Sequence, residues 1–128
     1  MKVNHYRDLL VWQKSMDIVV RCYRLSSIFP GEERYGLTSQ LRRAAVTVPA
    51  NIAEGHGRSA TKPFLNHLSI AMGSLKELET HILIAEKLGY VTETQISKLM
   101  EDCMEVGKML NGLSRSLTEQ SEDQKTKS

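Results

Sequence analysis

Two long apolar stripes in the second half of the chain constrain its fold more than any other feature. In both stripes apolar residues recur at alternating separations of three and four positions, which places them along one face of an α-helix. The stripes consist of Phe64, Leu68, Ala71, Leu75, Leu78, Ile82 and Ala85, and of Ile96, Leu99, Cys103, Val106, Leu110, Leu113 and Leu117. A helix with such a stripe is stable in water only when it packs against other helices, so the pattern predicts a helical bundle.

The first half of the chain predicts two further helices, at about residues 8–28 and 37–54. The earlier segment has two adjacent apolar stripes, so its apolar arc is wider than one neighbouring helix needs. These stripes are Leu9, Trp12, Met16, Val19 and Tyr23, and Val11, Ile18, Cys22 and Leu25. Pro49 lies inside the later segment, where we expect it to kink the helix or to end its regular part early. Gly55 and Gly57 are expected to cap this helix and to begin a turn.

Short connections between the four segments predict one architecture. We expect the third and fourth helices at about residues 62–88 and 93–117, with a Thr92-x-x-Gln95 capping box before the fourth. Connections of this kind force neighbouring helices to lie antiparallel. The predicted fold is all-α, an antiparallel up-down-up-down four-helix bundle that forms a single domain over residues 1–117. Residues 118–128 have no apolar side chain and are expected to form a disordered polar tail.

The composition narrows the class of protein further. The chain has 128 residues, of which 41% are hydrophobic and 25% are charged, as in one ordinary globular domain. Its two cysteines, Cys22 and Cys103, form no C-x-x-C motif and are expected to be buried thiols. No apolar stretch is long enough to cross a membrane, and the charged N-terminus lacks the apolar segment of a signal peptide. We therefore expect a cytoplasmic protein with no membrane partner.

The net charge of +2 conceals an uneven distribution. Residues 1–63 contain ten Lys and Arg against five Asp and Glu, a balance of +5, whereas residues 64–128 contain seven against ten, a balance of −3. Seven of the eight arginines lie in the first half, and the planar donors of arginine suit phosphate. Either the two halves attract each other within the bundle, or the basic half binds an anionic partner such as RNA. The candidate binding residues are Arg21, Arg24, Arg42, Arg43 and Arg58.

A short string after Pro49 is the most distinctive local motif. Asn51 and Glu54 flank two apolar residues, and Gly55 and Arg58 follow. We expect these polar groups to satisfy backbone atoms that the proline and the helix end leave unpaired. The alternative is an anion-binding or partner-binding site at the tip of the bundle.

The sequence contains no recognised motif for catalysis, cofactor binding or metal binding. A di-iron bundle needs Glu-x-x-His on two helices, and this spacing does not occur. The nucleotide-binding glycine motifs and the Gly-x-Ser-x-Gly nucleophile motif are also absent. Glu77 and His81 lie four residues apart and are expected to form a hydrogen-bonded pair rather than a metal site. We therefore predict a protein without enzyme activity, catalytic residues, cofactor or metal.

Apolar residues outside the main stripes indicate self-association. The second stripe of the first helix contributes Val11, Ile18 and Leu25, and Met100 and Met104 lie off the core stripe of the fourth helix. Exposed faces that contain methionine suit assembly. These five residues form the predicted oligomer interface.

Four ordered sequence blocks resemble those of a known family. They are Asp8-Leu9-x-Val11-Trp12-Gln13-Lys14-Ser15-Met16, then Phe29-Pro30-x-x-Glu33-x-Tyr35-Gly36-Leu37-Thr38-Ser39-Gln40-Leu41-Arg42-Arg43-Ala44, then Val48-Pro49-Ala50-Asn51-Ile52-Ala53-Glu54-Gly55 with Arg58, and Leu68-Ser69-Ile70-Ala71-x-Gly73-Ser74-Leu75-x-Glu77-Leu78-Glu79-Thr80. Over about residues 5–115 the chain is similar to the four-helix-bundle proteins encoded in intervening sequences of bacterial 23S ribosomal RNA genes, also called S23 ribosomal proteins. This resemblance implies a small cytosolic bundle without catalytic residues.

The resemblance also carries an expectation about assembly. The family is similar in fold to the accessory protein of diversity-generating retroelements, a basic bundle that forms a pentamer, so a homo-oligomer and specifically a pentamer are implied. The first functional hypothesis is a non-enzymatic oligomeric bundle that binds RNA or an RNA-handling protein through its arginine-rich half. The alternative is a purely structural or protein-interaction module that does not bind nucleic acid.

Overall fold

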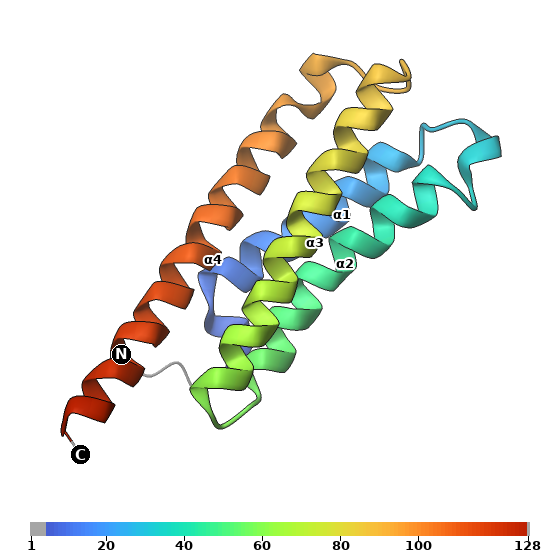
Figure 1. Ribbon diagram of the computed structural model, residues 1–128. Coiled ribbons are helices and arrows are strands. Elements are labelled where there is room, and N and C mark those ends of the chain that lie inside the picture. Colours follow the sequence, from blue (N-terminus) through green and yellow to red (C-terminus); the bar gives the residue numbers. More distant parts are fainter. Residues whose placement is uncertain (1–4, 128) are drawn as a thin grey trace.

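The protein is almost entirely helical (Figure 1). The computed structural model describes residues 5–127. Its elements in chain order are η1 Tyr6–Asp8, α1 Leu10–Ser26, η2 Gly31–Glu33, α2 Leu37–His56, α3 Thr61–Lys87 and α4 Glu93–Lys127, where η denotes a short 3₁₀-helix. These residues contain no β-strand, and none of their helices is both long and apolar enough to cross a membrane.

Successive helices run antiparallel beside one another (Figure 1). The helices α1 and α3 each contact both α2 and α4, which closes the bundle. The α1–α2 and α3–α4 connections lie at one end, and the α2–α3 turn lies at the other. The predicted all-α, up-down-up-down four-helix bundle in a single domain is therefore confirmed.

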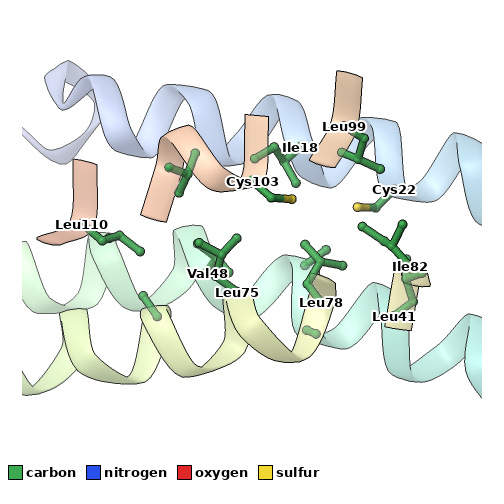
Figure 2. Packing of buried hydrophobic residues seen from close by; sticks show 14 of the residues in the cluster. Ile18, Cys22, Leu41, Val48, Leu75, Leu78, Ile82, Leu99, Cys103 and Leu110 are labelled. Carbon is green, nitrogen blue, oxygen red and sulfur yellow. The ribbon is translucent and has the colours of Figure 1, made fainter. Parts of the chain in front are cut away.

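The core is built from the predicted stripes of α3 and α4 packed against α1 and α2 (Figure 2). All seven stripe residues of α3 are buried, as are the first five of α4, whereas Leu113 and Leu117 are only partly buried. Burial of each large aliphatic side chain contributes about 1.5–3 kcal/mol, so these stripes dominate the stability of the fold. Cys22 of α1 and Cys103 of α4 are both buried, and their sulfur atoms point toward each other in Figure 2.

The orientation of α1 corrects part of the predicted oligomer interface. Val11 and Ile18 are only 5% and 3% exposed, so they belong to the core of one chain and their assignment to an interface is wrong. In the other stripe Met16 and Tyr23 are exposed, whereas Leu9, Trp12 and Val19 are partly buried against the core. The stripe that contains Val11 and Ile18 did not look like a core stripe in the sequence, because polar Ser15 interrupts it. The Ser15 hydroxyl donates to the Trp12 carbonyl (2.8 Å), which satisfies this small polar group inside the core.

Helix α2 continues through Pro49 and ends at His56, so its regular part does not end early. Pro49 is buried, and the Asn51 side-chain amide donates to the Thr47 carbonyl (3.0 Å). Gly57 stands at the C-cap as predicted, but in right-handed geometry (φ −70°), whereas Gly55 lies inside the last helical turn.

Gly55 is required for close packing rather than for the turn. A Cβ atom at this position would lie 2.7 Å from the Cβ of His67 and 2.9 Å from Phe64 Cδ1, both on α3. These distances are shorter than real Cβ contacts allow, so the α2–α3 approach depends on a residue without a side chain.

Helix α4 runs to Lys127, so the prediction of a disordered tail over 118–128 is wrong for residues 118–127, and residue 128 lies outside the described residues. The last turns of α4 extend past the other helices in Figure 1. No glycine or proline follows Gly112, and the Glu, Gln and Lys of this segment are good helix formers. Intrinsic helix propensity continues a helix that the core has already nucleated, even where no apolar residue remains.

The α3–α4 connection is fixed by two capping motifs. Gly89 adopts a left-handed φ of +78°, and its amide donates to the Glu86 carbonyl (2.9 Å), which ends α3. Thr92 and Gln95 form the predicted capping box, in which each side chain accepts a hydrogen bond from the other residue's backbone amide (3.2 and 2.8 Å).

Candidate functional site

An open groove of about 520 Å³ lies where the end of α1, the following connection and the first turns of α2 meet. We name it the arginine groove. It is lined by Tyr23, Arg34, Tyr35, Thr38, Ser39, Arg42, Arg43 and Val46. Three guanidinium groups and two phenol rings therefore share one hollow, and no carboxylate lines it. The combination of cations, hydroxyls and aromatic rings suits a phosphate-bearing ligand.

Arg42 is both a lining residue and a structural link. Its Nε donates to Ser26 Oγ (2.8 Å), and its Nη2 donates to the Tyr23 carbonyl (3.3 Å). Its guanidinium carbon also lies 4.6 Å from the centre of the Tyr23 ring, a cation–π distance. These contacts fasten α2 to the end of α1 and hold the Tyr23 ring at the edge of the groove.

Arg43 points into solvent at the same groove. Its side chain is exposed, and within the described residues 5–127 its guanidinium has no ion-pair partner. Since two adjacent helical residues diverge by about 100°, the pair supplies one anchored and one free cation. The prediction that Arg42 and Arg43 belong to a binding surface remains untested by the geometry alone.

Tyr35 is the more exposed of the two tyrosines that line the groove, with 87% of its surface accessible. The guanidinium carbon of Arg34 lies 5.4 Å from the centre of the Tyr35 ring. Sequence reasoning did not identify Arg34, Tyr35 or Tyr23 as site residues. An arginine directly followed by an aromatic residue in a connection was the available signal, but the pattern does not reveal which way a loop side chain faces.

The connection that carries Arg34 and Tyr35 is anchored by Glu33. The Glu33 carboxylate accepts hydrogen bonds from the Tyr90 hydroxyl (2.7 Å) and from the Leu37 amide (3.2 Å). The Tyr90 bond, then the Leu37 bond, lowers the pKa of Glu33, and the same contact with Glu33 raises the pKa of Tyr90. The Phe29 and Tyr90 rings also pack with their centres 5.7 Å apart. One wall of the groove is thus fixed to the α3–α4 connection.

The other predicted arginines do not reach this groove. Arg21 is paired with Asp102 of α4, and Lys98 approaches the same carboxylate (3.2 Å). Partial burial opposes ionisation, but the hydrogen bonds from Arg21 and Lys98 prevail and lower the pKa of Asp102. Lys14 and Glu105 are also paired (2.9 Å). Two basic residues of α1 therefore form ion pairs with acidic residues of α4 within the bundle.

Arg24 and Arg58 lie in two further places. Arg24 is exposed and lines a separate groove between α1 and α4. Arg58 lies just beyond α2 at the opposite end of the bundle and pairs with Glu54 at 3.5 Å. The structure therefore brings together Arg42 and Arg43 but separates both from Arg21, Arg24 and Arg58.

The motif that follows Pro49 connects α2 with α3. While the Asn51 amide nitrogen donates to Thr47, its Oδ1 lies 3.0 Å from His67 Nδ1 of α3. Glu54 is engaged by Arg58, and Gly55 permits the close helix approach. These contacts agree with the structural interpretation of the motif.

Neither cysteine has the properties of a nucleophile. Burial raises the pKa of Cys22 and of Cys103 to about 12, so both thiols stay protonated at neutral pH. His81 Nε2 lies 3.3 Å from Glu77 Oε1, the hydrogen-bonded pair that the spacing predicts. Within residues 5–127 the structure contains no cluster of three or more metal-binding side chains.

Of the remaining predicted interface residues, Leu25 and Met100 line two surface grooves, whereas Met104 lies elsewhere, beside Met72 and Lys76. Leu25 lies with Ile28 and Leu99 between α1 and α4, where Arg21 and Arg24 form a basic rim. We name this the basic-rimmed groove. Met100 lies with Leu83 and Ile96 between α3 and α4, beside Glu86 and Glu93, in what we name the acidic-rimmed groove. Both Leu25 and Met100 are half-buried, whereas Met104 is 56% exposed.

Comparison with known proteins supplies a family and a related structure. The sequence model of the 23S rRNA-intervening sequence protein family matches residues 7–112. The chain is also similar to a crystal structure of a protein of unknown function from the S23 ribosomal protein family of Bacteroides thetaiotaomicron, with 24% sequence identity and a TM-score of 0.76. That match covers 82% of this chain and 98% of the other. No curated protein matches the chain. Since the family match spans most of the sequence, and the predicted resemblance is confirmed, the chain belongs to the 23S rRNA-intervening sequence protein family.

Proposed function

We propose that this protein is a non-enzymatic bundle that binds RNA through the arginine groove. The observation that carries the proposal is the grouping of Arg34, Arg42 and Arg43 in a hollow that no carboxylate lines. Phosphate contacts from arginine supply most of the affinity of a protein for nucleic acid. Lys14 and Arg21 form ion pairs with α4, whereas Arg34 and Arg43 line the groove, where they can pair with a ligand.

A salt titration of RNA binding tests this proposal. If the three arginines each neutralise one phosphate, the slope of log K against log salt concentration is about −2 for single-stranded RNA. Arg43→Glu is expected to weaken binding strongly and to make the slope shallower by at least about 0.7. The matched control is Lys62→Glu, which makes the same charge change on an exposed residue at the far end of the bundle.

The result also decides between the two functional hypotheses. Equal loss of affinity in Arg43→Glu and Lys62→Glu would show a diffuse charge effect and contradict the groove. If the wild-type chain binds no RNA at low salt, the alternative holds, and the protein is a structural or protein-interaction module.

We propose in addition that the protein forms a homo-oligomer, with the pentamer implied by the family resemblance as its size. The observation that supports assembly is the pair of apolar grooves with rims of opposite charge, basic between α1 and α4 and acidic between α3 and α4. Two different, complementary patches produce a head-to-tail contact, and such contacts form a ring where the rotation between neighbouring chains closes. Ile28 in the basic-rimmed groove and Leu83 in the acidic-rimmed groove are both exposed, so each face offers apolar area to a neighbouring chain.

Sedimentation equilibrium tests the assembly. We expect a mass of five chains for the wild type and a smaller mass for Leu83→Asp, because a carboxylate would be buried in the contact. A wild-type protein that sediments as a monomer at all concentrations would contradict the assembly without affecting the proposal for RNA.

A further inference from the structure

We propose that the arginine groove accepts unpaired, single-stranded nucleotides, whose bases stack on Tyr35 and Tyr23, rather than double-stranded RNA. This inference rests on the proposed RNA binding and specifies the form of RNA that the groove takes. The two tyrosine rings carry it, because phosphate recognition alone does not need them.

Tyr35 presents an exposed aromatic ring from an anchored stretch of backbone. Tyr35 is 87% exposed, yet the residue two positions earlier, Glu33, is bonded to Tyr90 and to the α2 backbone. Arg34 lies near the ring at 5.4 Å, so a cation accompanies the aromatic face. A base that stacks on Tyr35 would remove this ring from water and place its phosphate near an arginine.

Tyr23, near the end of α1, supplies a second ring to the groove. Its ring is half exposed, and the guanidinium of Arg42 lies against it at 4.6 Å. Because Arg42 is itself held by Ser26 Oγ, the ring and the cation keep a defined relation without a ligand. A ring that is already held in place loses less conformational entropy when a base stacks on it than a mobile side chain does.

The other lining residues of the groove suit a sugar-phosphate chain. Thr38 and Ser39 contribute hydroxyl groups from the first turn of α2, and Val46 adds an apolar contact farther along the helix. The hollow of about 520 Å³ lies within the range of roughly 300–1,000 Å³ that is typical of ligand sites.

Double-stranded RNA would leave most of these features unused. In an A-form duplex the faces of the bases are stacked on one another, and proteins recognise it through its shape, its phosphates and its 2′-hydroxyls. Tyr35 and Tyr23 would then contact no base face. Unpaired nucleotides expose their faces and are commonly stacked on aromatic side chains and arginine.

The test compares two fluorescent probes by anisotropy, an unstructured 12-nucleotide oligouridine and a blunt 12-base-pair RNA duplex, at the same low salt concentration. We expect the wild type to bind the single strand more tightly than the duplex. Tyr35→Ala should weaken single-strand binding at least about fivefold, the lower end of the range for one stacked base, and should leave duplex binding unchanged. Tyr35→Phe is the matched control and should bind like the wild type, since it keeps the ring.

The outcomes separate this inference from the proposal on which it rests. If duplex binds as tightly as the single strand, or if Tyr35→Ala binds like the wild type while Arg43→Glu does not, the inference is overturned and the proposed RNA binding stands. If neither probe binds, the proposed function fails and the inference fails with it. Thermal melts of each variant verify folding, and Tyr35 is so exposed that its loss should not change the melting temperature.

Discussion

Arg42 and Arg43 are adjacent in the sequence but have different surroundings. Arg42 bonds to the Ser26 hydroxyl and the Tyr23 carbonyl and packs on the Tyr23 ring, whereas the guanidinium of Arg43 extends into solvent. A variant that changes both at once would therefore mix a loss of structure with a loss of binding. Changing them one at a time separates the two roles.

We expect Arg42→Ala to lower the free energy of unfolding by about 1–2 kcal/mol, since hydrogen bonds and a cation–π contact are lost together. Arg43→Ala should change it by less than about 0.5 kcal/mol, as exposed substitutions do. Urea denaturation of both variants measures the difference. Equal destabilisation by the two variants would contradict the distinct roles assigned here.

Gly55 also has a role that the structure alone reveals. Gly55→Ala should lower the free energy of unfolding by about 1–3 kcal/mol, because the added Cβ would overlap with His67 and Phe64. Gly73 provides the control, since it lies in α3 and a Cβ there would meet no atom within 4 Å. Gly73→Ala should therefore raise stability by about 0.5–1 kcal/mol, as in any exposed helix. A stabilising effect of both substitutions would show that the α2–α3 contact tolerates a methyl group.

At the scale of the elements, periodicity predicted the helices well and their orientation less well. The stripes of α3 and α4 are uninterrupted, so their buried faces follow directly from the spacing of apolar residues. In α1 the stripe predicted to form an interface is the buried one, because Ser15 within it is polar by residue type but buried with its hydroxyl satisfied. The end of α4 was missed because apolar periodicity marks where a helix packs, not where it stops.

The arginine groove was only half predictable for a related reason. Arg42 and Arg43 lie on a predicted helix, so their positions could be anticipated. Arg34 and Tyr35 lie in the connection, and their direction depends on the bond between Glu33 and Tyr90, residues 57 positions apart. Such a long-range contact leaves no periodic signal in a single sequence.

The Glu33 anchor predicts a dependence of stability on pH. Since the folded-state pKa of Glu33 lies below its ordinary value of 4.5, its contribution to stability is present above about pH 4.5 and is lost as the pH falls through the folded-state pKa. The difference in unfolding free energy between the wild type and Glu33→Gln should therefore shrink on acidification. Denaturation curves at pH 7 and pH 3 measure it, and a difference that stays constant would contradict the anchor.

For the molecule as a whole, the uneven charge resolves into two parts. Some of the basic charge of α1 is paired with the acidic charge of α4, through Arg21 with Asp102 and Lys14 with Glu105. Another part remains open in the arginine groove, at the end of the bundle where the α1–α2 connection lies. The ion pairs agree with the intramolecular interpretation of the charge split, and the open groove is where we propose that an anionic partner binds. The family match and the four-helix fold describe the scaffold, and the groove is where we place its function.

The most direct measurement of this claim is the perturbation of backbone amide NMR signals during titration with the oligouridine probe. We expect the signals from Arg34 to Val46 to shift in proportion to bound RNA, together with that of Tyr23. Signals near the α2–α3 turn, from Glu54 to Lys62, should stay in place. Shifts confined to the α1–α4 side around Arg24 and Gln95, or no shifts at low salt, would contradict it.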